Sequence, residues 1–262
     1  MKISIITTVY NHPRVIEALD SVLAQRLDPG DELELVVIDG GSTDGTLSRL
    51  EGYRSRVAVF LSEKDSGIYD GMNKGIERAS GDIIGILNSD DLYEDDHALA
   101  TVLEIFHSSD AQVVYGDLVY VREDDPSKVV RYWKSSPYED GLFERGWMPP
   151  HPSFFVRRQV YEQHGCFDLA FQLASDLDLM IRFLVKARMR FQYVPKVLVR
   201  MRLGGASNKS VRNIIKGNLE GYRACKKNGL KVSLLFFVHK IISRIPQFFM
   251  RPTAAPRNDH GI

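Results

Sequence analysis

Two adjacent carboxylates, Asp90 and Asp91, follow an apolar run in the stretch LNSDD, residues 87–91. The residues just before them, 83–87, have the composition of a buried strand. Like charges repel at this spacing, so the pair indicates that a cation binds nearby. Adjacent hard oxygen ligands suit Mg²⁺ or Mn²⁺, ions that bind one or two carboxylates together with substrate phosphates. A solvated or helix-initiating pair of acids is the structural alternative.

Polar residues also gather at the ends of the other strands expected in the first half. After the strands at 3–9, 33–38 and 57–61 stand Thr8, Tyr10, Asn11, Asp39, Glu63, Lys64 and Asp65. Helical patterns separate these near-continuously apolar strands, which predicts an α/β fold with a mostly parallel, Rossmann-like sheet flanked by helices. Ligands bind at the carboxyl ends of such strands, so we expect these residues and Asp90-Asp91 to form one site.

Two residues of the second half also have types suited to chemistry. Asp176, in ASDLDLMIRF, lies in the first turn of a helix expected from 175 to 186, with Ser175 as its cap. It is either an acid that stabilises the helix dipole or a general base for a hydroxyl nucleophile. His151 lies in the loop PPHPSFF, and the sequence is compatible with a packing histidine or a site histidine.

Two common nucleotide-binding motifs are absent from the sequence. Neither G-x-G-x-x-G nor G-x-x-x-x-G-K-[ST] occurs, and the first strand–helix turn reads TTVYNHP. Dinucleotide-binding Rossmann sites and P-loops are therefore disfavoured. The glycine-rich stretch DGGSTDGT, residues 39–46, predicts a tight turn into a short helix that ends at Glu51, with Thr43 as its N-cap.

Charge is unevenly distributed along the 262 residues, which are enough for one sizeable core or a core plus a small appendage. The net charge is zero, but the segment from Lys209 onward carries eleven Lys and Arg against two acids. This asymmetry indicates an anionic surface as partner. Within residues 234–249, Lys240 and Arg244 stand four apart among apolar residues. The pattern fits a basic helix at a membrane interface or a helix packed on the domain.

Several other classes are disfavoured by the sequence. Cys166 and Cys225 match no metal spacing, which favours a reduced, cytosolic chain. The N-terminus MKISIITTVYN is typical of a first strand and not of a signal peptide, and no apolar run is long enough to predict a membrane span. The basic tail alone is compatible with nucleic acid, but no nucleic-acid-binding module is found.

Six segments, in this order, resemble family 2 inverting glycosyltransferases of bacterial exopolysaccharide, capsule or O-antigen synthesis: ISIITTVYN, VVIDGGSTDGT, SEKDSGIYDGMNKGI, GDIIGILNSDD, HPSFFVRRQVYEQHGCFD and ASDLDLMIRF. The pair IYDGMNKGI and LNSDD is similar to the colanic-acid-type branch. The resemblance implies a GT-A fold over residues 1–207, with a nucleotide-sugar-binding half at 1–117 and an acceptor and catalytic-base half at 118–207. A basic helical extension, 208–262, would follow.

The resemblance also implies roles for single residues. Asp91 would bind Mn²⁺ or Mg²⁺, although the motif reads Ser89-Asp90-Asp91 and not Asp-x-Asp, and Asp176 would be the catalytic base. Donor-binding positions would be Thr8, Tyr10, Asp39 on the base, Lys64, Asn73, Asp90 near the ribose, and His151. Some members carry an arginine where this chain has Gly67, with Lys64 as a substitute, so uracil and guanine both stay open. The loop RMRLGGAS, residues 200–207, is expected near the diphosphate and the acceptor.

The expected activity is inverting transfer of a sugar from a UDP- or GDP-sugar to a hydroxyl of a glycan or lipid-linked acceptor. A sugar-nucleotide pyrophosphorylase is disfavoured because TTVYNHP lacks the glycine-rich basic loop of those enzymes. A non-catalytic nucleotide-sugar-binding scaffold of a membrane polysaccharide-synthesis complex is the alternative. The resemblance implies a cytoplasmic protein whose tail makes peripheral contact with the anionic cytoplasmic face of the inner membrane, with no nucleic-acid partner.

Overall fold

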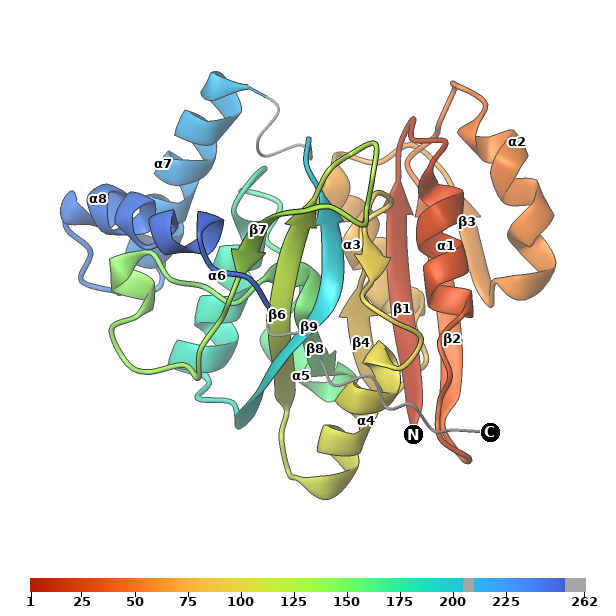
Figure 1. Ribbon diagram of the computed structural model, residues 1–262, viewed down its shortest axis with the longest axis horizontal. Coiled ribbons are helices and arrows are strands. Elements are labelled where there is room, and N and C mark those ends of the chain that lie inside the picture. Colours follow the sequence, from red (N-terminus) through yellow and green to blue (C-terminus); the bar gives the residue numbers. More distant parts are fainter. Residues whose placement is uncertain (205–209, 253–262) are drawn as a thin grey trace.

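The structure is a computed structural model that describes residues 1–204 and 210–252 (Figure 1). Within these residues one nine-stranded sheet has the order β3-β2-β1-β4-β8-β6-β9-β5, with β7 paired to β6. The strands are β1 Lys2–Val9, β2 Glu32–Asp39, β3 Val59–Ser62, β4 Ile83–Ile86, β5 Leu92–Tyr93, β6 Val113–Val121, β7 Val129–Trp133, β8 Phe154–Arg157 and β9 Phe191–Arg202.

The helices alternate with the strands in the first half and cluster at the end of the chain. The α-helices are α1 Val15–Leu23, α2 Thr46–Leu50, α3 Ile68–Arg78, α4 Ala98–Ser108, α5 Arg158–His164, α6 Ser175–Ile181, α7 Val211–Lys227 and α8 Leu235–Ile242. Short turns of other helix types are η1 Glu51–Arg56, η2 Phe143–Arg145, η3 His151–Ser153, the π-helical η4 Arg182–Lys186, and η6 Ile245–Phe248.

The first half of the sheet is parallel, and the second half is mixed. β1 pairs in parallel with β2 and β4, and β3 pairs in parallel with β2. β8 runs antiparallel to β4 and β6 and so ends the parallel part, while β6 and β9 pair in parallel beyond it. The predicted α/β fold is confirmed. The carboxyl ends of β1 to β4 meet at one edge of the sheet, and Thr8, Asp39 and Asp91 lie at or just beyond these ends.

Helices cover both faces of the sheet, which explains why the strands are apolar on both sides (Figure 1). One core contains Leu19 of α1 and Phe106 of α4, packed against Ile5 of β1. The other core contains Met72 of α3 and Leu179 of α6. These pack with those side chains of β1 and β2 that point to the other face of the sheet. Both α3 and α6 therefore rest on the same face of the sheet.

Two pairs of predicted strands are single strands in the structure. The pieces expected at 113–115 and 118–121 form β6, and those expected at 191–194 and 197–201 form β9. The register between β6 and β9 shifts next to Gly116, where Pro195 and Lys196 have no partner. Proline has no backbone N–H to donate to a neighbouring strand. At a bulge that hydrogen bond is not needed, so Pro195 can remain inside β9.

Both helix-capping predictions are wrong. Thr43 does not cap α2, which begins at Thr46; the carboxylate of Asp44 instead accepts hydrogen bonds from the Thr46 N–H at 3.0 Å and its Oγ1 at 2.6 Å. Ser175 is the first residue of α6 and not its cap, and its hydroxyl donates to the backbone oxygen of Asp168 at 2.9 Å. Competing local hydrogen bonds of Asp and Ser displaced the expected caps.

Gly85, in the middle of β4, makes room for an aromatic ring of β8. A Cβ at this position would lie 2.6 Å from Cε1 of Phe155 and 2.9 Å from Cδ1 of Ile5, both fully buried. We expect Gly85→Ala to lower the free energy of unfolding by about 1–3 kcal/mol, because neither neighbour can move away. Denaturant unfolding measures this. Gly52→Ala, with no atom within 4 Å, is the matched control, and equal midpoints for the two variants would contradict the prediction.

The C-terminal helices α7 and α8 lie together at one side of the molecule, beyond α6 (Figure 1). None of the helices in the described ranges is long and apolar enough to cross a membrane. The predicted boundary at 207/208 lies outside the described residues, and the boundary at 117/118 falls within β6.

Candidate active site

Asp39, the last residue of β2, is fully buried and oriented by the turn that follows it. Its Oδ2 accepts hydrogen bonds from the backbone N–H groups of Gly41 at 3.2 Å and Ser42 at 3.1 Å, and from the Ser62 hydroxyl at 2.6 Å. Its Oδ1 accepts only a longer bond from Ser42, at 3.3 Å. The backbone of Lys64 lies beside Gly41, and the Lys64 side chain is exposed. One Asp39 oxygen therefore retains capacity for a ligand N–H.

Thr8, near the end of β1, faces α3 at a point where a glycine allows close approach. A Cβ on Gly71 would lie 3.2 Å from Cγ2 of Thr8 and 3.3 Å from Oδ2 of Asp65. The hydroxyl of Thr8 is buried and has no hydrogen-bond partner in the part of the chain that the structure describes. Burial also raises the pKa of Asp65, which follows β3. Tyr10, two residues beyond Thr8, is exposed at the rim.

Asp91 is a fully buried acid with an unsatisfied oxygen. Its Oδ2 accepts a hydrogen bond from Nδ2 of Asn88 at 2.8 Å, but its Oδ1 has no partner among residues 1–204 and 210–252. Burial raises the pKa of Asp91 well above its usual value, and the carboxylate of Asp90 adds to the rise. Arg202, at the end of β9, donates to the backbone oxygen of Asp90 at 3.4 Å. This buried carboxylate requires a proton or a cation.

The donor set at Asp91 fits a divalent ion that completes its coordination with substrate. Carboxylate oxygens are the ligands that Mg²⁺ and Mn²⁺ prefer, and the unsatisfied Oδ1 of Asp91 is free to bind one. No group of three or more His, Cys, Asp or Glu in the described residues could hold an ion by itself. Oxygens of a bound diphosphate would have to supply further ligands, which is the usual arrangement for Mg²⁺.

Asp176 lies in the first turn of α6, as predicted, with one oxygen fixed and the other free. Its Oδ1 accepts hydrogen bonds from the Tyr69 hydroxyl at 3.1 Å and the Leu177 N–H at 2.9 Å. Its Oδ2 makes no hydrogen bond within the described ranges. Tyr69 belongs to α3, the helix that also approaches Thr8, so one helix connects the acid to the ends of β1 and β3. A half-buried carboxylate held in this way suits a general base.

His151 and Tyr120 both lie within the electrostatic influence of Asp176. Burial lowers the pKa of His151, and the charge of the Asp176 carboxylate opposes this fall. Burial raises the pKa of Tyr120, and the charges of both Asp91 and Asp176 add to that rise. The charges of both the predicted catalytic acid and the predicted metal-binding acid therefore act on Tyr120. A neutral His151 can donate or accept a hydrogen bond.

Asn73 is engaged by the backbone of a neighbouring segment. Its Nδ2 donates to the backbone oxygen of Phe167 and its Oδ1 accepts from the Phe167 N–H, both at 2.9 Å. Phe167 in turn stacks on Tyr69 with ring centroids 5.3 Å apart. The contacts of Asn73 thus position the residues around Asp176, and its expected contact with the donor stays a prediction.

Four residues of the site were not predicted: Tyr69, Asn88, Tyr120 and Arg202. Asn88 stands three residues before Asp91, so its place in LNSDD was an available signal. Arg202 belongs to the stretch RMRLGGAS, whose residues 200–204 are described and whose last three residues lie outside the described ranges. Tyr69 and Tyr120 had no local signal, because each reaches the site from a different part of the chain.

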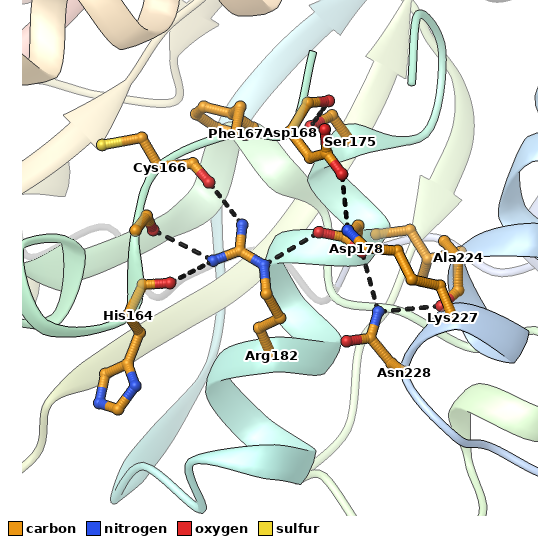
Figure 2. Close-up of polar contacts among 12 residues, drawn as sticks. His164, Cys166, Phe167, Asp168, Ser175, Asp178, Arg182, Ala224, Lys227 and Asn228 are labelled. Atoms are coloured by element: carbon orange, nitrogen blue, oxygen red, sulfur yellow. Dashed lines mark hydrogen bonds and ion pairs between the residues drawn. The ribbon is translucent and has the colours of Figure 1, made fainter. Parts of the chain in front are cut away.

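A buried ion network anchors α6, the helix that carries Asp176 (Figure 2). Asp178, fully buried, accepts hydrogen bonds from Nε of Arg182 at 2.9 Å and from Nζ of Lys227 at 3.1 Å. Arg182 also donates to backbone carbonyls of residues 164–166. The network joins α6 to the end of α7 and to the segment after α5, so it fixes the first turn of α6.

Comparisons with known proteins agree with this geometry. A model of glycosyl transferase family 2 matches residues 4–167. The PGL/p-HBAD biosynthesis glycosyltransferase of Mycobacterium bovis is 31% identical over 214 residues, which cover 79% of this chain and 80% of that protein. An uncharacterized glycosyltransferase of Mycobacterium tuberculosis is 30% identical over 182 residues, 69% of this chain and 68% of its own length.

Two solved structures share the fold. S. aureus TarS 1–349 in complex with UDP-GlcNAc superposes with a TM-score of 0.65 at 18% identity, covering 93% of this chain and 79% of that one. Mannosyltransferase PcManGT from Pyrobaculum calidifontis, in complex with GDP-Man and Mn²⁺, gives a TM-score of 0.60 at 20% identity, with 84% and 64% covered. These likenesses confirm the GT-A type of fold.

Proposed function

We propose, because this chain belongs to glycosyl transferase family 2, that it transfers a sugar with inversion from a UDP- or GDP-sugar to an acceptor hydroxyl. Family membership makes the protein a glycosyltransferase; the inverting course, the divalent ion and a glycan or lipid-linked acceptor of surface polysaccharide synthesis are our proposal. One observation carries it. Asp91, just beyond the end of β4, is a fully buried carboxylate whose Oδ1 has no partner in the described part of the chain, which fits a bound cation.

The nucleotide part of the donor would lie at the ends of β1, β2 and β3. Asp39 would accept an N–H of the base through its Oδ1, the oxygen with spare capacity. The buried Thr8 hydroxyl, which lacks a partner within the described residues, would bond the donor, and Asp90 would bind near the ribose. Tyr10 and Lys64 are exposed at the rim, where a ring face and an ammonium can contact base and phosphate.

Asp91 would hold the divalent ion, with Asn88 orienting the other carboxylate oxygen. When bound, Mn²⁺ or Mg²⁺ supplies positive charge that stabilises the diphosphate as it leaves. The Mn²⁺ that accompanies GDP-Man in the complex of the P. calidifontis mannosyltransferase supports this choice. Burial of Asp91 disfavours its charged form, so deprotonated Asp91 depends on a nearby cation.

Asp176 would act as the general base through its free Oδ2, while Tyr69 and the N–H of Leu177 hold Oδ1. The proton of the acceptor hydroxyl passes to Oδ2, and the hydroxyl oxygen forms a bond to the anomeric carbon. The bond from that carbon to the diphosphate oxygen breaks on the opposite face. A single displacement of this kind inverts the configuration.

Nucleotide binding tests the donor site. We expect calorimetry to show that UDP or GDP binds in the presence of Mn²⁺ and that a chelator weakens the binding. Asp91→Ala should weaken it by at least the roughly 10–100-fold that loss of an outer-shell metal partner costs. Glu104→Ala, which removes an exposed acid of α4, is the matched control and should bind normally. Failure of both nucleotides to bind the wild-type protein would contradict the proposal.

Contact with the cytoplasmic face of the inner membrane is part of the proposal. Large apolar side chains of α8, such as Leu235, Val238 and Ile241, are exposed and form a continuous face. Lys240 and Arg244 are turned toward the domain, so membrane contact would depend on the apolar side chains of α8 and not on these two cations. The scaffold alternative has no observation in its favour.

A further inference from the structure

The segment that contains α8 has its cations inside and its apolar residues outside. Lys240 and Arg244 are each partly buried, on the same side as the fully buried Phe236. Eight apolar residues of the segment are 48% to 82% exposed: Leu234, Leu235, Val238, Ile241, Ile242, Ile245, Phe248 and Phe249. An ordinary surface helix shows the reverse arrangement, with charged residues toward water. The inward orientation of Lys240 and Arg244 is therefore unusual, and a ligand bound between this segment and the domain would explain it.

Neither inward cation has an anionic partner in the described part of the chain. Neither the Lys240 ammonium nor the Arg244 guanidinium makes a hydrogen bond or an ion pair with any residue that the structure describes. The surroundings of Lys240 are apolar: its Nζ lies 5.7 Å from the ring centroid of Phe236 and 3.8 Å from where a Cβ of Gly221 would stand. Burial lowers the pKa of Lys240 to about 8, and the charge of Arg244 adds to the fall. Two neighbouring unpaired cations in this environment are costly unless an anion joins them.

The cation pair lies on the side of the catalytic base. A Cβ on Gly221 of α7 would lie 3.2 Å from Cδ2 of Leu177, the residue after Asp176, and 3.8 Å from Nζ of Lys240. The charge of Asp176 raises the pKa of Lys240. Arg244 and Tyr120 affect each other's pKa, and the charges of Asp176 and Asp91 raise the pKa of Tyr120. An acceptor must present its hydroxyl at Asp176, so an anion bound by the pair would belong to the acceptor.

We propose that Lys240 and Arg244 bind a phosphate group of the acceptor substrate. This inference depends on the proposed function, because it takes Asp176 as the base. Two positive charges match a phosphate dianion, whereas one carboxylate would leave one of these partly buried cations without an anion. The planar guanidinium can bind two phosphate oxygens, and the ammonium adds a point charge. Phosphate bound here would hold the neighbouring hydroxyl of the acceptor close to Asp176.

Binding of inorganic phosphate tests the pair directly. The full-length protein would be saturated with Mg²⁺ and with the nucleotide that it binds, so that the donor site is filled, and then titrated with phosphate in a calorimeter. We expect saturable binding that Lys240→Met and Arg244→Met each weaken by roughly tenfold or more. Lys231→Met, which removes an exposed lysine of the same C-terminal region, is the matched control and should bind like wild type.

A second readout separates this role from a structural one. Lys240→Met replaces a partly buried cation that has no anionic partner in the described residues with an apolar chain of similar length, so its thermal unfolding midpoint should rise while its phosphate affinity falls. A variant with a lower midpoint and unchanged phosphate binding would overturn the proposal, as would a wild-type protein that binds no phosphate. If no nucleotide binds either, the proposed function fails; if nucleotide binding is normal, only the phosphate site fails.

Vesicle flotation distinguishes the two sources of such a phosphate. Vesicles of phosphatidylcholine with and without phosphatidic acid present the same lipid chains with and without a phosphomonoester. A preference for phosphatidic acid that Lys240→Met removes would identify a lipid-borne phosphate, for which the exposed apolar face of α8 is suited. Binding of inorganic phosphate without this preference would identify a water-soluble acceptor phosphate. Both outcomes support the phosphate site.

Discussion

Replacing Asp176 with asparagine is expected to slow sugar transfer by roughly 10²–10⁴-fold, the usual contribution of a general base. Asparagine has the same shape, and its Oδ1 can still accept the hydrogen bond that the Tyr69 hydroxyl gives Asp176. Its amide cannot take a proton from the acceptor hydroxyl. Donor binding should be unchanged, because the proposed donor contacts lie at the ends of β1 to β4. Release of UDP or GDP from the donor measures the rate, and calorimetry measures the binding.

The matched control for this variant is Asp110→Asn, which changes an exposed acid that pairs with Arg190 far from the site. It should retain the wild-type rate. An Asp176→Asn variant that also transfers at the wild-type rate would show that another group takes the proton. A wild-type protein that binds the donor and never releases the nucleotide diphosphate would favour the scaffold alternative.

Removing the carboxylate of Asp178 is expected to lower the free energy of unfolding by about 3–5 kcal/mol, because it leaves buried charge without a partner. Asp178 is fully buried, and Arg182 is only 18% exposed in its side chain. Lys227 is 46% exposed and can turn to water, and Arg182 keeps its backbone carbonyl partners in residues 164–166. The effect of Asp178→Ala should therefore be nearer to the lower end of that range. Urea unfolding measures it.

An exposed ion pair provides the control for the Asp178 experiment. Asp124 pairs with Arg122 on the surface, where its side chain is 68% exposed, so Asp124→Ala should change stability by no more than about 0.5 kcal/mol. If the Asp178→Ala variant unfolds at the same urea concentration as Asp124→Ala, the network in Figure 2 contributes little to stability. Loss of the network should also reduce transfer, because Asp176 lies two residues before Asp178.

The sequence was sufficient for the strand–helix alternation of the first half and for the polar residues at the ends of β1, β2 and β4. Strand–helix alternation has a strong periodic signal, and the carboxyl ends of parallel strands share one edge, so Asp39 and Asp91 were expected together. The division of β9 was wrong because Pro195 has the local features of a strand end. The caps were wrong because Asp44 and Ser175 bond other local groups.

Contacts between distant parts of the chain were beyond the reach of the sequence pattern. The bond from Tyr69 to Asp176 spans 107 residues, and nothing local to either residue indicates it. The orientation of α8 is a second example. Lys240 is four residues from both Phe236 and Arg244, so all three lie on one side of the helix. This spacing alone does not tell whether that side faces solvent or packs on the domain. Tertiary packing of Phe236 decides between the two.

The pairing of β5 with β9 has a consequence for how the protein is made. β5 directly follows Asp91, and its antiparallel partner is the end of β9, where Arg202 also bonds the backbone of Asp90. During synthesis, Asp90 and Asp91 therefore leave the ribosome about a hundred residues before β9, the strand that packs beside them. The nascent chain can build β1 to β4 early, but the end that carries Asp90 and Asp91 stays open until residue 202 has emerged.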